Sequence, residues 1–383
     1  MEPIYLDHAA TTPIHSDVQA KMTDVMQHHF GNPSSIHRYG RDGRKLLDES
    51  RTTAAKALNA PFSSIIFTSG GTEANNLAIF GTAHAYRAQG NHIITTTIEH
   101  HAVLHPCEQL EAAGFEVTYL PVDQSGQVRV QDVQAALRDD TILVTIMAVN
   151  NETGVVQPIQ EISDVLTDHQ AVFHTDAVQM FGVMPIDVTE LGVDLLTASS
   201  HKIYGPKGVG LLYKRDDIHL EQQLLGGEQE RKWRPGTENT LAIAGFNQAI
   251  QTLQANREKR HEHYQALQDR LILELEKQGI EFSVNGDLTQ RVPNIINLSF
   301  PKTEVEMFLT NLDLAGIAVS SGSACTAGSI DPSHVLKAMY GEKDARLTNS
   351  IRFSFGIDNT EDDMQIVAEK IKPIIERLEK VVT

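Results

Sequence analysis

A lysine and an aspartate stand near the ends of two strand-like segments in the middle of the chain. Lys202 lies in ASSHKIYGPKGVG, after an apolar run and before a Gly/Pro-rich turn, and Asp176 ends AVFHTD. A pyridine aldehyde needs such a pair, because the amine forms a Schiff base and the carboxylate keeps the ring nitrogen protonated, so that the ring accepts electrons. A surface lysine and a capping aspartate are the ordinary alternatives for either residue alone.

Candidate phosphate donors surround this pair. Ser199 and His201 flank the lysine, and the segment TSGGTEANN joins a strand to a helix around Gly71 and Thr72. Free N–H groups at a helix N-terminus bind phosphate without a full positive charge. The segment has neither the Gly-Lys-Ser/Thr of a P-loop nor a dinucleotide fingerprint. These residues therefore predict a cofactor that carries one phosphate.

A histidine follows another strand-like segment, HIITTT. His100, in IEHHAV, comes shortly after this segment, where an imidazole can stack on a planar ring and move protons near neutral pH. Its neighbour His101 has the same side chain, and a histidine without a function at a helix entry is the ordinary alternative. We favour His100 as the residue that stacks on the cofactor.

One of the two cysteines stands among small polar residues. Cys325 lies in SSGSACTAGSIDPS, where no apolar run would hold it in a core, and this composition predicts a mobile loop. Because the thiolate is the nucleophilic form of cysteine, such a loop can bring a nucleophile to a bound substrate. Cys107, in HPCEQLEAAG, lies in an amphipathic pattern and is interpreted as structural.

These side chains need a fold that gathers strand ends. Short apolar segments alternate with helical patterns, and we predict strands over 64–69, 92–97, 115–120, 141–149, 171–176, 193–200 and 208–214. This alternation predicts an α/β fold with a mostly parallel sheet and helices on both faces. Ligands bind such sheets outside the carboxyl ends of the strands.

The C-terminal third has a different pattern. One long helical pattern runs from Thr240 to Gly279, and strands and helices then mix in an α+β arrangement. We predict a large cofactor-binding domain over 15–255. A small domain would consist of 1–14 and 256–383 and would carry the Cys325 loop.

Composition excludes several classes of protein. The net charge of −18 argues against direct binding to nucleic acid, and no apolar run approaches the length of a membrane span. Two cysteines cannot form a disulfide framework, and the 17 histidines are scattered, so we predict no metal site. The N-terminal sequence has neither a signal-peptide nor a transit-peptide pattern. A cytoplasmic protein without a membrane partner is expected.

The chain resembles the cysteine desulfurases, pyridoxal-phosphate enzymes of the NifS/IscS-like group within aminotransferase class V. The resemblance covers the whole chain through YLDHAATTP, GNPSSIH, FTSGGTEANN, VNNETGVVQPI, HTDAVQ, SSHKIYGPKGVG, RPGTEN, VSSGSACT and SIRFSFG. It implies the aspartate-aminotransferase fold, called fold type I, and a homodimer. It also implies conversion of L-cysteine to L-alanine, with the sulfur carried as a persulfide on Cys325.

The resemblance assigns roles residue by residue. Lys202 holds the pyridoxal 5'-phosphate, Asp176 pairs with the ring nitrogen and His100 stacks on the ring. Further contacts are implied for Gln179 at the ring hydroxyl, for Asn151 near the ring oxygen and the substrate, and for phosphate donors at Gly71, Thr72, Ser199, His201 and, across the dimer, Thr237. The implied substrate residues are Arg352, which binds the carboxylate, and Asn32 and Arg234, which border the pocket.

Several alternatives stay open. An aminotransferase, a kynureninase-like hydrolase or a selenocysteine lyase would use the same scaffold, but these enzymes do not need a mobile Cys325. A non-catalytic sulfur-handling protein would be expected to have lost a site residue, and a redox-sensing Cys325 would not explain the cofactor residues. The expected sulfur acceptor is an iron–sulfur scaffold or a tRNA-thiolating enzyme. The chain ends at Thr383 without the longer tail with which some relatives dock a scaffold, which favours the tRNA-thiolating enzyme.

Overall fold

A seven-stranded sheet forms the centre of the computed structural model, which describes residues 3–321 and 332–382. The strand order is β2-β8-β7-β6-β5-β3-β4, and only β8 runs against its neighbours. The α/β fold predicted from the sequence is thereby confirmed. The strands are β2 (Ile65–Thr68), β3 (His92–Thr96), β4 (Glu116–Leu120), β5 (Thr141–Thr145), β6 (Val172–Asp176), β7 (Leu195–Ser199) and β8 (Gly210–Lys214).

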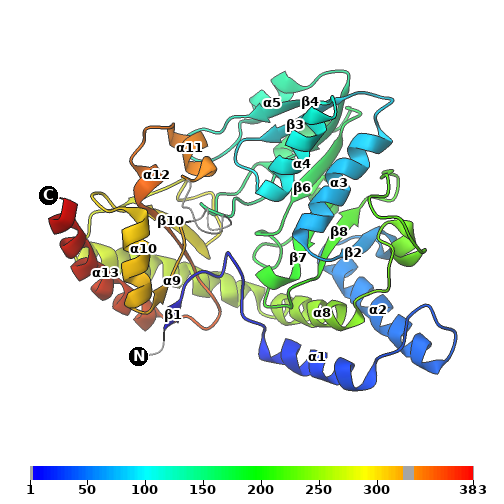
Figure 1. Ribbon diagram of the computed structural model, residues 1–383, viewed down its shortest axis with the longest axis horizontal. Coiled ribbons are helices and arrows are strands. Elements are labelled where there is room, and N and C mark those ends of the chain that lie inside the picture. Colours follow the sequence, from blue (N-terminus) through cyan, green and yellow to red (C-terminus); the bar gives the residue numbers. More distant parts are fainter. Residues whose placement is uncertain (1–2, 322–331, 383) are drawn as a thin grey trace.

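Helices cover both faces of this sheet (Figure 1). Because successive strand residues point to opposite faces, Leu195 packs with one set of helices and Leu196 with another. The first set contains α3 (Gly71–Ala85) and α4 (His101–Ala112). The second face is covered by α5 (Val130–Ala136), α6 (Ile159–Leu166), α7 (Val188–Leu191) and α8 (Thr240–Gln254), and α8 packs in turn against α1 (Ser16–His28) and α2 (Arg38–Ala57).

A smaller sheet lies beside the large one. Its central strand β10 (Ile295–Ser299) pairs antiparallel with β12 (Ser350–Ser354) and β9 (Ser283–Val284). β1 (Ile4–Tyr5) pairs with β11 (Ile317–Ala318). The helices of this part are α9 (Arg257–Lys277), α10 (Val305–Leu314), α11 (His334–Tyr340), α12 (Arg346–Asn349) and α13 (Glu361–Val382). Within the two described ranges, no helix is both long and apolar enough to cross a bilayer.

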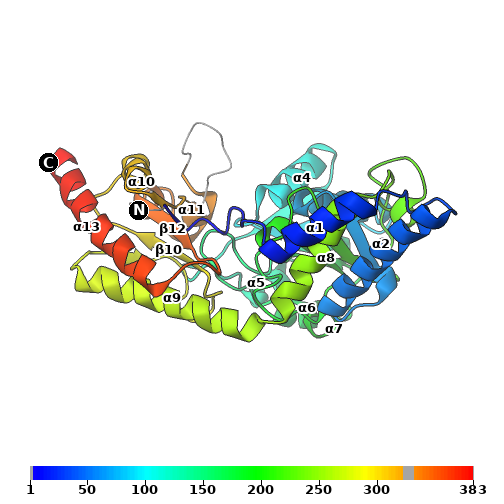
Figure 2. The ribbon, with the colours of Figure 1, turned by 90° about the horizontal axis from the view of Figure 1, so that it is seen from below.

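The prediction of one long helical element from Thr240 to Gly279 is wrong. The structure has two helices, α8 and α9, which are separated at Ala255–Asn256, where Asn256 leaves the helical region with φ −131° and ψ 20°. α8 packs on α1 and α2, whereas α9 packs on α13 at the other end of the molecule (Figure 2). The break lets each helix follow a different core. The division into domains at 255/256 stays a prediction.

A buried histidine ties three strands of the large sheet together. His174 of β6 is fully buried, with Nδ1 2.8 Å from the Thr145 hydroxyl of β5 and Nε2 3.1 Å from the Thr197 hydroxyl of β7. Burial disfavours the imidazolium and lowers the pKa of His174 to about 3. The neutral ring is therefore the form that the folded sheet accepts.

We expect the free energy of unfolding to fall as the pH falls below about 6.5, because the unfolded chain then binds a proton at His174 that the folded protein excludes. The contribution of His174 to the slope of the unfolding free energy against pH approaches about 1.4 kcal/mol per pH unit. It falls to zero near pH 3, where the imidazole of the folded protein also binds a proton. Urea denaturation over a pH series measures the slope. His174→Gln keeps an amide donor and acceptor and should reduce it; an unchanged slope would contradict the prediction.

Candidate functional site

A cavity of about 260 Å³ lies at the carboxyl ends of the parallel strands and the N-terminus of α3. The structure brings most of the predicted site residues together around it: Gly71, Thr72, His100, Asn151, Asp176, Gln179, Ser199, His201, Lys202 and Arg352. They come from strand ends, from turns and, for Arg352, from the smaller sheet. The cavity therefore lies between the two sheets.

Asp176 is held rigidly at the end of β6. Its Oδ1 accepts the Val178 N–H at 2.9 Å, and its Oδ2 accepts a hydrogen bond from Asn75 Nδ2 at 2.7 Å. The side chain thus presents a fixed carboxylate to the cavity, as a protonated ring nitrogen requires. Asn75 was not predicted from the sequence, although it lies four residues after Gly71 and therefore on the same face of α3.

His100, and not His101, faces the cavity. His100 caps α4, and its Nδ1 accepts the Ala102 N–H at 3.0 Å, so the neutral ring carries its proton on Nε2. Burial lowers the pKa of His100; the carboxylate of Asp176 acts in the opposite direction and the charge of Lys202 adds to the lowering. His101 instead packs against the rings of His105 and His334, with centroids 4.9 and 5.0 Å away.

Lys202 contacts the N-terminal segment of the chain. Its Nζ donates to the carbonyl oxygens of Ala9 at 2.5 Å and Ala10 at 2.8 Å. Gln179 Nε2 also donates to the Ala9 carbonyl, at 3.0 Å. The sequence analysis did not find these carbonyl groups, because backbone acceptors leave no residue-type signal. They hold the primary amine at the cavity wall, where it can reach an aldehyde.

One end of the cavity offers donors to an anion. The buried Ser199 hydroxyl has no hydrogen-bond partner among residues 3–321 and 332–382, and Gly71 and Thr72 begin α3 beside it. His201 Nδ1 lies 3.2 Å from the Thr11 hydroxyl, and burial, aided by Lys202 and another nearby lysine, lowers the pKa of His201 to about 4. An unsatisfied buried hydroxyl beside a helix N-terminus fits a single phosphate group. Together with Asp176 and Lys202, these donors fit pyridoxal phosphate.

The opposite wall carries a buried arginine. Arg352 is 3% exposed; its Nη1 donates to the Asn151 carbonyl at 2.8 Å and its Nη2 pairs with Asp7 Oδ1 at 2.8 Å. The buried Nε finds no hydrogen-bond partner in the part of the chain that the structure describes. A planar guanidinium binds carboxylates through two parallel N–H groups, so Arg352 suits the carboxylate of an amino acid. Asp7, in YLDHAATTP, is a contact that the sequence analysis missed.

Three predicted residues are not in this cavity. Thr237 and Asn32 are exposed elsewhere in the chain, and Asn32 Oδ1 accepts the Ser34 N–H at 2.9 Å. Arg234 does not line the cavity either and pairs with Glu73 in the first turn of α3. Cys325 lies outside the described residues.

The described residues on both sides of Cys325 are hydrogen-bonded to a residue that lines the cavity or to the neighbour of one. The Arg352 N–H donates to the Ser320 carbonyl at 2.7 Å. On the other side, the Ser333 hydroxyl donates to the buried Glu152 carboxylate at 2.5 Å, and Glu152 adjoins Asn151 in the chain. Both attachment points therefore involve residues that line the cavity or directly follow one in the chain.

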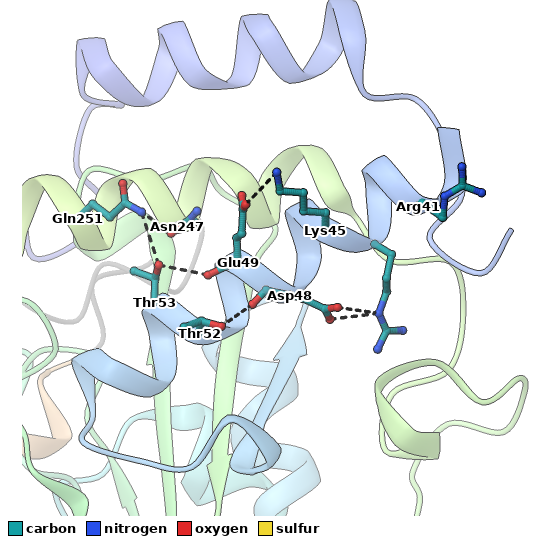
Figure 3. A pocket seen from close by; sticks show the side chains of 9 residues that line it. Arg41, Lys45, Asp48, Glu49, Thr52, Thr53, Asn247 and Gln251 are labelled. Carbon is teal, nitrogen blue, oxygen red and sulfur yellow. Dashed lines mark hydrogen bonds and ion pairs between the residues drawn. The ribbon is translucent and has the colours of Figure 1, made fainter. Parts of the chain in front are cut away.

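A larger hollow of about 660 Å³ lies over α2 and α8 (Figure 3). Four of its five charged side chains form ion pairs along α2, with Arg44 3.1 Å from Asp48 and Lys45 3.8 Å from Glu49. These pairs are exposed and lie one helical turn apart, as is common on a solvated helix face. Arg41 donates instead to the Ile36 carbonyl at 2.8 Å, and we assign no ligand site to this hollow.

Comparisons with known proteins extend the argument beyond the geometry. The family described as Aminotransferase class-V matches residues 4–367. Putative cysteine desulfurase IscS 1 of Bacillus subtilis (strain 168) is 54% identical over 378 residues, which cover 99% of this chain and 100% of that protein. Cysteine desulfurase IscS of Dictyoglomus turgidum (strain DSM 6724 / Z-1310) is 48% identical over 375 residues, covering 98% and 95%. A solved structure described as a NifS-like protein has a TM-score of 0.91 at 33% identity, and the match covers 98% of this chain and 100% of that one.

We expect Ser199→Ala to change the free energy of unfolding of the cofactor-free protein by less than about 0.5 kcal/mol, because the Ser199 hydroxyl has no hydrogen bond to any described residue. The matched control is Ser354→Ala, whose buried hydroxyl accepts the Ala9 N–H and donates to the Leu6 carbonyl. That variant should lose about 1–3 kcal/mol. Urea denaturation measures both, and equal losses would contradict the assignment of Ser199 as an unsatisfied donor.

Proposed function

The chain belongs to the class-V aminotransferase family, and from that premise we propose that it is a pyridoxal-phosphate-dependent cysteine desulfurase. It converts L-cysteine to L-alanine and places the released sulfur on Cys325 as a persulfide. The relatives named cysteine desulfurase support this proposal. The observation that carries it is the single cavity that holds Lys202, Asp176 and the buried Arg352.

The residues around the cavity would hold the cofactor from three sides. Lys202 would bind its aldehyde carbon, Asp176 its ring nitrogen, and His100 the face of its ring. The remaining cofactor contacts would come from Gln179 and Asn151 at the ring oxygen and from Gly71, Thr72, Ser199 and His201 at the phosphate. When bound, pyridoxal phosphate supplies an electron sink for the α-carbon of the substrate.

The substrate residues act around that centre. Arg352 binds the carboxylate of L-cysteine and orients the amino acid, with Asn151 beside it. Lys202 Nζ accepts the α-proton of the substrate, and His100 Nε2 transfers the proton at the reacting thiol. The Cys325 thiolate attacks the substrate sulfur: the C–S bond breaks, an S–S bond forms, and the carbon is protonated. One L-cysteine and one thiol thus give one L-alanine and one persulfide, without an external oxidant.

Chain length supports the role of Cys325. Ser321 is a described residue four positions before Cys325 in the sequence. Because a residue spans at most about 3.6 Å, four residues allow a separation of at most about 14 Å. Ser320 is hydrogen-bonded to the backbone of Arg352. This limit on the chain length, together with the bond between Ser320 and Arg352, supports the proposed transfer of sulfur to Cys325.

The acceptor of the persulfide sulfur is proposed by chemical class. An iron–sulfur scaffold protein or a tRNA-thiolating enzyme would take the sulfur through its own thiol, so the contact is between proteins. The net charge of −18 opposes direct binding of the RNA. A reducing cytoplasm is the proposed location, because it keeps a single reactive thiol free.

The proposed enzyme is a homodimer. An apolar patch near the start of α2, formed by Met26, Phe30, Ile36 and Tyr39, is exposed, with Ile36 92% exposed. The Phe30 and Tyr39 rings lie 5.0 Å apart within it. Several exposed large apolar side chains within one short segment of the chain support an interface there. In the dimer, Thr237 would reach the phosphate in the other subunit, and Asn32 would border the pocket there.

We expect Cys325→Ala to abolish alanine release from L-cysteine while the bound cofactor keeps its absorbance, because only the sulfur acceptor is removed. The control is Cys107→Ala. Cys107 is buried in α4, and burial raises the pKa of its thiol far above the usual value, so it supplies no thiolate. Alanine release is measured with and without an added thiol.

Two results would contradict parts of this proposal. Alanine and sulfide release by Cys325→Ala at the wild-type rate would favour a lyase that needs no acceptor thiol. A wild-type protein that holds the cofactor but does not turn over L-cysteine would remove the desulfurase assignment itself.

We expect the double variant Phe30→Lys/Ile36→Lys to be monomeric, because two charges would lie within a desolvated interface. Light scattering during size-exclusion chromatography measures the mass. Leu314→Lys is the control, since Leu314 is 81% exposed but lies on α10, outside the patch. A dimeric double variant would place the interface elsewhere.

A further inference from the structure

A buried ion pair that does not line the cavity joins α2 to the segment before α8. Arg51 Nη2 lies 2.6 Å from Glu230 Oε1, and Arg51 Nη1 donates to Glu230 Oε2 at 2.8 Å. The two side chains are only 8% and 2% exposed. The Arg51 guanidinium also lies over the Phe67 ring, 5.0 Å from its centroid. The two parallel hydrogen bonds fix the orientation of the Arg51 and Glu230 side chains relative to each other. Removing both charges from water costs considerable free energy.

The pair also binds the outer edge of β2. β2 is the edge strand of the large sheet, and within the described ranges it pairs only with β8. Glu230 Oε2 accepts the Phe67 N–H at 3.0 Å, and Arg51 Nη1 donates to the Ile65 carbonyl at 2.5 Å. The ion pair therefore satisfies edge groups that a neighbouring strand would otherwise bind. It holds β2 just before the turn that leads to Gly71.

Glu230 reaches this position through an unfavourable backbone. Glu230, Arg231 and Lys232 have φ values of 45°, 55° and 74°. Three consecutive residues with side chains in the left-handed region are uncommon, because each Cβ is crowded there. Such a segment persists when surrounding contacts hold it, and the bonds of the Glu230 carboxylate are contacts of that kind.

A second ion pair carries the connection to α3. Arg234 Nε lies 3.0 Å from Glu73 Oε1, and Glu73 Oε2 accepts the Ser69 N–H at 3.0 Å. Ser69 precedes the glycines of the TSGGTEANN turn. Arg234 lies two residues after Lys232, so the left-handed segment that the Glu230 carboxylate anchors leads to the residue that pairs with Glu73. The Arg51–Glu230 pair thus contacts β2, and the Arg234–Glu73 pair contacts the turn between β2 and α3; neither pair lines the cavity.

We infer that Arg51 and Glu230 are positioning residues for the phosphate-binding turn at Gly71 and Thr72. They act through β2 and through the Arg234–Glu73 pair, and they do not touch the ligand. The inference rests on the proposed function, because it takes this turn to bind the phosphate of pyridoxal phosphate. It predicts that loss of the buried pair weakens recognition of the phosphate specifically.

The test compares two ligands that differ only in the phosphate. Glu230→Gln and Arg51→Lys are prepared cofactor-free, and their affinities for pyridoxal phosphate and for pyridoxal are measured by absorbance titration. We expect affinity for pyridoxal phosphate to fall about tenfold or more, as a misplaced binding group produces. Affinity for pyridoxal should be unchanged. The control is Glu228→Gln, the same substitution on an exposed carboxylate whose partner is Lys232 at 3.3 Å, and it should change neither affinity.

Three results would overturn the inference. Equal losses for both ligands would show a general structural effect, and no loss for either would show that the pair does not act on the turn. A wild-type protein that binds neither ligand would overturn the proposed function as well. The other two results concern the variants alone and leave the proposed function standing.

A second variant keeps the test decisive if Glu230→Gln does not fold. Arg234 and Glu73 are 28% and 21% exposed, so Arg234→Gln disturbs the core less. It should show the same selective loss for pyridoxal phosphate. Combined with Arg51→Lys it should lower the affinity by less than the product of the two single effects, because both variants act on one turn. Multiplicative losses would contradict the connection.

Discussion

The parallel alignment of buried strands is the constraint on which the site depends. β3, β5, β6 and β7 run in the same direction and are buried along their length, so the polar residues near their ends emerge at one edge. This edge receives His100, Asp176 and Ser199 although they are far apart in the sequence. A shift of one residue in a strand would turn its side chains to the other face. Packing of the apolar strand residues in the core thus fixes the relative positions of the polar side chains at this edge.

The N-terminal segment joins the two halves of the cavity. The Thr12 N–H donates to the His201 carbonyl at 2.9 Å, while the carbonyls of Ala9 and Ala10 accept from Lys202. Toward the smaller sheet, the Asp7 carboxylate pairs with Arg352. The distance between the proposed cofactor lysine and the proposed carboxylate-binding arginine is therefore set by a short stretch of backbone that contacts both. This explains how residues on different sheets can act on one amino acid.

The sequence predicts what depends on local pattern and on residue type. The strands from β2 to β8 follow from apolar runs, and Asp176 and Lys202 are recognisable because of where those runs end. Asn75, Asp7 and the Ala9 carbonyl were missed because their roles arise only when distant segments meet. The break at Asn256 was missed for a related reason. Helix propensity continues through it, and packing against two different cores overrides the propensity.

Because Arg352 is buried, it is already paired with Asp7 before a substrate carboxylate binds. A guanidinium with 3% exposure needs a counter-charge, and Asp7 supplies it at Nη2, while no described residue is hydrogen-bonded to Nε. A substrate carboxylate that binds through Nε and Nη2 must therefore displace or share Asp7. Part of the attraction between arginine and substrate offsets the loss of the Asp7 contact, so the net affinity is lower than the ion pair alone would give. Uniformly tight substrate binding does not accelerate the chemical step, whereas an arginine that is already oriented before binding does favour turnover.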